Sequence, residues 1–87
     1  MPYIEQEDRK RWDGIIADIV HEYHKEETLP GELNYLISSV VWQLFKDNPS
    51  YTYGNQLIGV LECVKQEFYR RQLADYEDRK MAQNGDI

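Results

Sequence analysis

Apolar side chains recur at helical spacing along most of this chain, and that periodicity restricts its fold more than any other feature. Steps of three and four residues place side chains on one face of an α-helix. The clearest run contains seven apolar residues: Leu33, Leu36, Ile37, Val40, Val41, Leu44 and Phe45. No segment alternates apolar and polar residues as a half-buried strand does. The sequence therefore predicts an all-α protein.

Two prolines divide the helical pattern into three parts. Pro30 suits the first turn of a helix, and Pro49 disfavours helical geometry in the residue before it. Ser50 and Thr52 are alternative N-caps for the helix that follows. We expect one domain of 87 residues that ends in a flexible tail. The predicted elements are helices at residues 8–24, 31–46 and 52–80 and a tail at residues 81–87.

The third predicted helix is longer than the other two. At about 1.5 Å per residue it reaches about 43 Å, whereas the second reaches about 24 Å. Its outer part, Phe68–Tyr76, is rich in aromatic residues and has no intrachain helix of matching length. A chain this short also forms a marginal core, which association of copies enlarges. We expect a homo-oligomer that associates through Phe68–Tyr76; a kinked helix and a solvated extension are the alternatives.

The apolar faces of the three helices are expected to share one small core. Val40 lies at the middle of the central apolar run, so a charge at this position should cost a large part of the stability of the domain. The expected core residues are Ile15, Ile16, Ile19, Leu36, Ile37, Val40, Leu44, Leu57, Val60, Leu61 and Val64.

Charge and cysteine content exclude several classes of function. Ten basic and sixteen acidic side chains give a net charge of −6, which opposes binding to DNA and to anionic membranes. No apolar run approaches the roughly 18–20 residues of a membrane span. A single cysteine, Cys63, rules out an intramolecular disulfide and a zinc site built from several thiolates. We expect a cytoplasmic protein with neither DNA nor membrane as a partner.

Two clusters place arginine beside aromatic residues. A guanidinium group pairs with phosphate while a neighbouring ring stacks on a base, so such clusters suit small nucleotide-like anions. The alternative is that these arginines form ion pairs with the abundant acids; for Arg70 and Arg71 the candidates are Glu67, Asp75 and Glu77. The predicted ligand-binding residues are Arg9, Arg11, Tyr69, Arg70, Arg71 and Tyr76.

Metal chemistry has weaker support in the sequence. His21 and His24 lie three residues apart, a spacing that places them on neighbouring helical turns. Paired carboxylates hold Mg²⁺ in all-α nucleotide pyrophosphohydrolases, and Glu32, Glu62 and Glu67 are the candidates here. Five residues separate Glu62 from Glu67, so the two point to different faces of a helix. The sequence predicts no catalytic residue, no metal site and no cofactor.

Several motifs together resemble a known family. They are Met1-Pro2-Tyr3-Ile4, Gly31-Glu32-Leu33-Asn34-Tyr35, Tyr76-Glu77-Asp78 and Asn84-Gly85-Asp86. With these motifs the chain resembles a family of small uncharacterised bacterial and bacteriophage proteins over nearly its whole length. The resemblance carries over no catalytic residue. It implies a viral or mobile-element setting, in which small acidic helical oligomers include inhibitors of host defence that sequester nucleotide signals.

These observations favour a binding protein over an enzyme. We expect a non-catalytic oligomer that holds a small anionic nucleotide-like ligand or a host protein at its subunit interfaces. The alternative is a metal-dependent nucleotide hydrolase of the all-α type. Bound Mg²⁺ or Mn²⁺ would favour that alternative.

Overall fold

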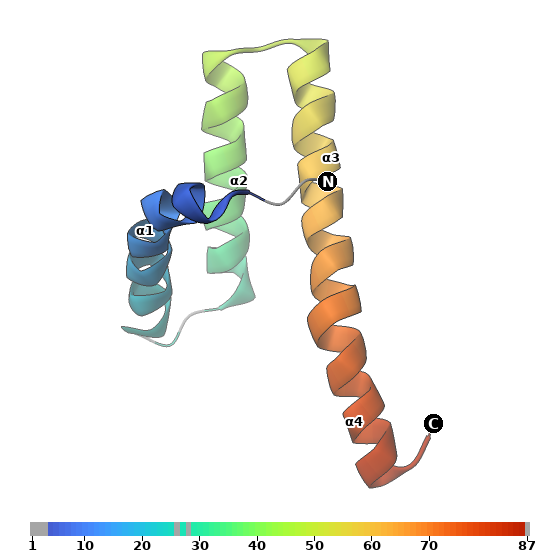
Figure 1. Cartoon of the computed structure of the whole chain (residues 1–87). Coiled ribbons are helices and arrows are strands. Elements are labelled where there is room, and N and C mark those ends of the chain that lie inside the picture. The colour runs from blue at the N-terminus through green and yellow to red at the C-terminus, as the bar shows by residue number, and fades with distance from the viewer. Residues whose placement is uncertain (1–3, 26, 28, 87) are drawn as a thin grey trace. The chain divides into compact units, whose positions relative to one another are not determined.

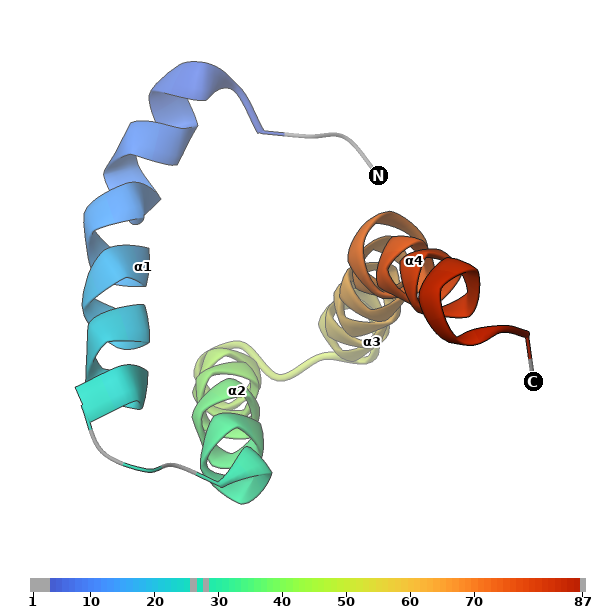
Figure 2. The ribbon, with the colours of Figure 1, turned by 90° about the horizontal axis from the view of Figure 1, so that it is seen from below.

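The computed structural model of the protein is entirely helical (Figure 1). It describes residues 4–25, 27 and 29–86, and 89% of these are helical with no strand among them. The elements are α1 (Gln6–Lys25), α2 (Pro30–Asp47), α3 (Tyr51–Phe68), the π-helical turn η1 (Tyr69–Leu73) and α4 (Ala74–Asn84). The ribbon passes from α3 through η1 into α4 without a break (Figures 1 and 2). The predicted all-α class and three helices are confirmed.

The ends of α2 follow from its flanking residues. Pro30 is the first residue of the helix, where its missing N–H costs no hydrogen bond. The backbone N–H of Leu29 donates to the Oε2 atom of Glu32 at 3.2 Å, which satisfies a donor at the helix entrance. The helix ends at Asp47, two residues before Pro49.

The long helix from Tyr51 to Asn84 is capped at both ends. Ser50 has extended backbone geometry, and its Oγ atom accepts from the N–H of Tyr53 at 3.0 Å, which identifies Ser50 rather than Thr52 as the N-cap. Gly85 has a φ of 87°, and its N–H donates to the carbonyl of Met81 at 2.9 Å. The helix therefore continues through residues 81–84, which were expected in the tail, because only this glycine ends it. Residue 87 of the predicted tail lies outside the described residues.

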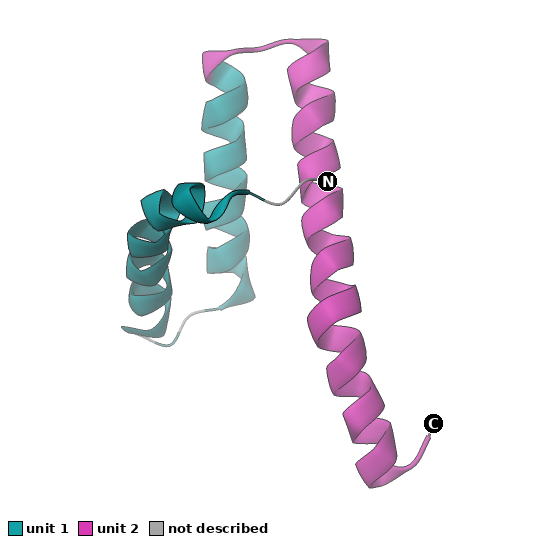
Figure 3. Ribbon diagram, viewed as in Figure 1, with its two compact units in different colours: residues 1–46 teal, residues 47–87 magenta. Residues whose placement is uncertain are grey.

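The chain divides into two compact units, residues 1–46 and residues 47–87 (Figure 3). The first unit holds α1 and nearly all of α2, and the second holds the single long helix. The prediction of one domain stays a prediction. Within the described residues, no helix combines the length and the apolar character that crossing a bilayer requires.

The expected core does not close within either unit. No described residue is buried, and Val40 remains 53% exposed. One or two helices cannot surround a side chain on all sides, so these residues form open apolar faces instead. In the first unit, α1 and α2 together line a groove with no polar surface. Its residues are Ile16, Ile19, Val20, Leu33, Leu36, Ile37, Val40 and Val41.

Candidate functional site

The candidate site is the aromatic segment, Phe68–Tyr76, on the long helix of the second unit. Four large side chains of this segment are exposed: Phe68 at 59%, Tyr69 at 52%, Leu73 at 40% and Tyr76 at 51%. The described part of this unit holds no second helix against which they could pack. An apolar surface of this kind, rimmed by charged residues, is typical of a protein interaction site.

A π-helical turn interrupts the helix inside the aromatic segment. The N–H of Ala74 donates to the carbonyl of Tyr69, five residues earlier, instead of four. The N–H of Tyr69 is shared between the carbonyls of Lys65 and Gln66. Single π turns within α-helices occur frequently at functional sites. Sequence reasoning missed this turn, although the five-residue step from Phe68 to Leu73 is a signal that could have revealed it.

Glu67 holds the two predicted anion-binding arginines. The Nη2 atom of Arg70 lies 3.2 Å from Glu67 Oε2 and 3.4 Å from Oε1, and the Nη1 atom of Arg71 lies 3.6 Å from Oε2. The predicted alternative, ion pairing of these arginines with Glu67, is confirmed. Asp75 instead pairs with Arg79 at 3.3 Å. Around this cluster the charges balance, because residues 67–80 hold four basic and four acidic side chains.

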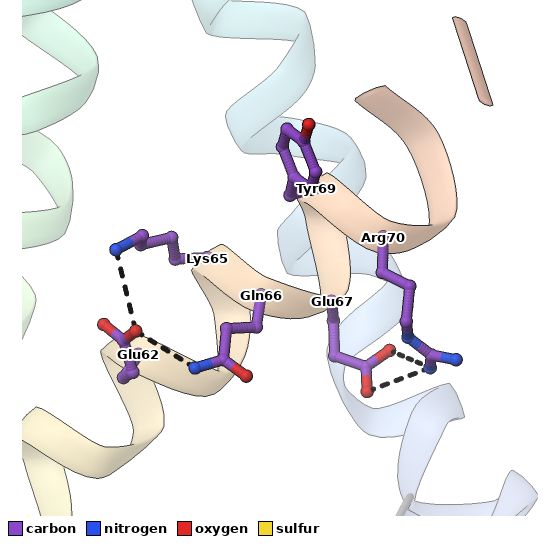
Figure 4. Close-up of a pocket in the computed structure, with 6 residues that line it drawn as sticks. All are labelled: Glu62, Lys65, Gln66, Glu67, Tyr69 and Arg70. Atoms are coloured by element: carbon purple, nitrogen blue, oxygen red, sulfur yellow. Dashed lines mark hydrogen bonds and ion pairs between the residues drawn. The ribbon is translucent and has the colours of Figure 1, made fainter. Parts of the chain in front are cut away.

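A shallow hollow lies beside this cluster on the helix surface (Figure 4). On its floor, Gln66 Nε2 donates to Glu62 Oε1 at 3.1 Å, and Lys65 Nζ lies 3.6 Å from the same oxygen. The hydrogen bond from Gln66 and the charge of Lys65 lower the pKa of Glu62. The hollow is lined by two acidic and two basic side chains, so its net charge is zero. Its lining residues are Glu62, Lys65, Gln66, Glu67, Tyr69 and Arg70.

The two predicted stacking tyrosines contact charged side chains further along the helix. The hydroxyl of Tyr69 donates to Glu77 Oε1 at 3.0 Å, a contact that spans the π turn. This hydrogen bond and the negative charge of Glu77 raise the pKa of Tyr69. The ammonium group of Lys80 lies 5.6 Å from the ring centroid of Tyr76, within reach of a cation–π interaction. In the single chain, each of the two tyrosines thus already interacts with a charged side chain of the same helix.

The remaining predicted ligand residues lie on α1 in the first unit. The guanidinium of Arg11 lies 4.9 Å from the ring centroid of Trp12, so the expected pairing of arginine with an aromatic ring is present. The Nε atom of Arg9 donates to the carbonyl of Ile4 at 3.4 Å. Arg9 and Arg11 therefore belong to the first unit, whereas the Glu67 cluster belongs to the second.

The candidate metal ligands whose contacts are described interact with residues near them in the sequence. Glu62 and Glu67 each pair with a cation one turn away on the same helix. The ring of Tyr23 meets that of His24 edge-on, with 6.1 Å between centroids. Across residues 4–25, 27 and 29–86, no three His, Cys, Asp or Glu side chains converge closely enough to share a metal ion.

Comparison with known proteins places the whole chain in one family. A family model described as a domain of unknown function (DUF6899) matches residues 1–87. The chain belongs to this family. No curated protein and no solved structure matches it. The predicted resemblance to a family of small uncharacterised proteins is thereby confirmed, whereas the bacterial or bacteriophage setting stays a prediction.

Proposed function

We propose that this protein is a non-catalytic helical binding protein that associates with copies of itself through the aromatic segment. The exposure of Phe68, Leu73 and Tyr76 on a helix without a partner in its own unit carries the proposal. Covering such side chains contributes about 1.5–3 kcal/mol for each one fully buried, which is enough across several residues to hold subunits together.

The charge of the segment supports an anionic ligand at the interface between copies. Arg70 and Arg71 both pair with the carboxylate of Glu67, so each copy brings two guanidinium groups together at one place on the helix. Two such clusters repel each other unless an anion lies between them. A small nucleotide-like anion fits this chemistry, because the guanidinium groups pair with its phosphate and Tyr69 or Tyr76 offers a ring for stacking. An acidic surface of a host protein is the other ligand that these arginines suit.

Native mass spectrometry and light scattering test the proposal. Native mass spectrometry of the protein purified from cells should show more than one copy of the chain, with any retained small molecule. Replacement of Phe68 and Leu73 by Glu should give a monomer. The matched control is Ile58→Glu, which changes an apolar side chain that is 67% exposed on the same helix but outside the segment. Light scattering that shows a monomer of the natural chain at micromolar concentration would contradict the proposal.

The ligand is tested separately from assembly. Arg71→Ala should leave the number of copies unchanged and lower the affinity for a purine nucleotide in calorimetry. An Arg71→Ala variant that assembles and binds the nucleotide as tightly as the natural chain would remove the nucleotide from the proposal. Loss of a co-purified protein, without any change in nucleotide affinity, would assign the arginines to a protein partner.

A further inference from the structure

One apolar stripe runs along the long helix on both sides of the π turn. Successive members lie three or four residues apart, except at one step of five residues between Phe68 and Leu73. The members of the stripe are Tyr53, Leu57, Leu61, Val64, Phe68, Leu73 and Tyr76. The single irregular step coincides with η1, which covers residues 69–73.

Regular α-helical geometry would break this stripe. Each residue of an α-helix advances by about 100° around the axis, so a step of four overshoots a full turn by about 40°. A step of five overshoots by about 140° and would carry Leu73 to the far side of the helix from Phe68, with Tyr76 turned about 80° away from Phe68. Polar residues, Arg71 and Gln72, would occupy the line of the stripe instead.

The π turn absorbs the extra residue. Because the N–H of Ala74 bonds to the carbonyl of Tyr69, the hydrogen-bonded loop here encloses one residue more than in the α-helix on either side. Leu73 and Tyr76 are thereby returned to the same side as Leu61, Val64 and Phe68. The chain adopts a rare backbone conformation at the one place where it keeps the apolar stripe continuous.

We propose that this continuous stripe is the contact surface for the same helix of a second copy of the chain, and that the π turn sets its register. The inference rests on the self-association proposed above and extends the interface from Phe68–Tyr76 to Tyr53–Tyr76. Length identifies the occupant. The helix from Tyr51 to Asn84 has segments of 18, 5 and 11 residues. It is therefore about 51 Å long, whereas α1 and α2 with 20 and 18 residues reach about 30 and 27 Å.

The stripe runs from Tyr53 to Tyr76, about 36 Å, and is covered completely only by a helix of at least that length. Among the described helices, only the long helix itself has that length, so a second copy provides the matching surface. A strip about 36 Å long and about 10 Å wide covers on the order of 360 Å² on each helix. Two such strips give roughly 700 Å², below the roughly 1,000 Å² of a stable interface, so we expect a weak dimer.

The test changes the step between Phe68 and Leu73 in both directions. Deletion of Gln72, an exposed residue within the π turn, reduces the step to four, so a regular α-helix keeps the stripe in line. Insertion of one alanine between Gln72 and Leu73 raises the step to six, which a single π turn does not absorb. The dissociation constant of each full-length variant is measured by sedimentation equilibrium, with circular dichroism as a check on helix content.

We expect the deletion to retain the dimer with an unchanged or lower dissociation constant. The insertion turns Leu73 and Tyr76 away from the interface and should raise the dissociation constant about 100-fold or more. If the insertion lowers helix content, Tyr76→Glu on the stripe is compared with Ile58→Glu beside it, and only Tyr76→Glu should weaken the dimer.

The possible results separate this inference from the proposed function. A natural chain that is monomeric at micromolar concentration overturns both. A dimer that tolerates the insertion or Tyr76→Glu as well as it tolerates the deletion overturns the stripe and leaves self-association standing. A dimer lost on deletion of Gln72 also overturns the inference, because it would show that the π turn itself, rather than the alignment, is needed for contact.

Discussion

The two units of this protein use their apolar residues in different ways. In the first unit, side chains from α1 and α2 face a common groove that has no polar surface. In the second unit, the apolar stripe belongs to one helix, and the described ion pairs all join residues three or four apart on that helix. Exposed pairs of this spacing add little to stability. The comparison teaches that the first unit gathers apolar side chains from two helices around one groove, whereas the second presents its apolar side chains on a single helix.

Val40→Asp should give the largest effect, and it tests whether the apolar groove of the first unit stabilises the fold. It places a charge among purely apolar groove residues at a position that is 53% exposed, so we expect a loss of about 2 kcal/mol in the free energy of unfolding. Urea denaturation followed by circular dichroism measures the loss. Trp42→Asp, on the same helix but outside the groove lining, should cost less. Equal losses in the two variants would show that the groove is not a packing surface.

Leu73→Ala tests whether the apolar stripe of the long helix contacts a second copy of the chain. Each copy should lose about 1 kcal/mol of contact free energy, which raises the dissociation constant of a dimer roughly 30-fold. Sedimentation equilibrium measures the change. Ile58→Ala, an exposed substitution on the same helix, serves as the control and should leave the constant within about twofold. An unchanged constant for Leu73→Ala would place the interface elsewhere.

Ser50→Ala sharpens the comparison by testing how much the long helix owes to its own local contacts. Loss of the bond from the Tyr53 N–H to Ser50 Oγ should cost about 1 kcal/mol of helix stability. Thermal denaturation of the variant should show a lower midpoint, and Ser50→Asp should recover most of it because aspartate caps equally well. A Ser50→Ala variant as stable as the natural chain would mean that the cap contributes nothing.

The pH responses of Tyr69 and Glu62 are the smallest effects expected. Hydrogen bonding to the charged Glu77 favours the neutral phenol in the folded helix, so its pKa is raised above the ordinary value near 10.0. The contribution of this contact is present below pH 10 and is lost as the pH rises through the raised pKa. Titration of carbon-labelled tyrosine by NMR should show the pKa of Tyr69 above its ordinary value, and Glu77→Gln should lower it. A Tyr69 pKa that does not respond to Glu77→Gln would contradict the contact.

Glu62 responds at the acidic end with the opposite sign. Its pKa is lowered by the hydrogen bond from Gln66 and by Lys65. The stabilisation is therefore present above the unfolded value near 4.5 and is lost as the pH falls through the lowered pKa. Gln66→Ala should raise this pKa in a carboxylate titration by NMR. An unmoved value would mean that the Gln66 contact is not formed in solution.

Much of the candidate site follows from local rules that the sequence already shows. Glu67 lies three and four residues from Arg70 and Arg71, and on a helix that spacing brings opposite charges together. The pairing of Arg11 with Trp12 is equally local. The contact of Tyr69 with Glu77 was not predicted, because eight residues separate them and the π turn lies between.

The sequence by itself determined the helices, since proline placement and the periodicity of apolar residues are local properties of the chain. It left open whether Ser50 or Thr52 caps the long helix and whether that helix kinks. It also led to the expectation of a closed core and a tail from residue 81. Only the tertiary structure decided these points. Burial depends on how many elements surround a side chain, and the choice of a π turn at Tyr69–Leu73 depends on backbone hydrogen bonds that no pairwise spacing rule specifies.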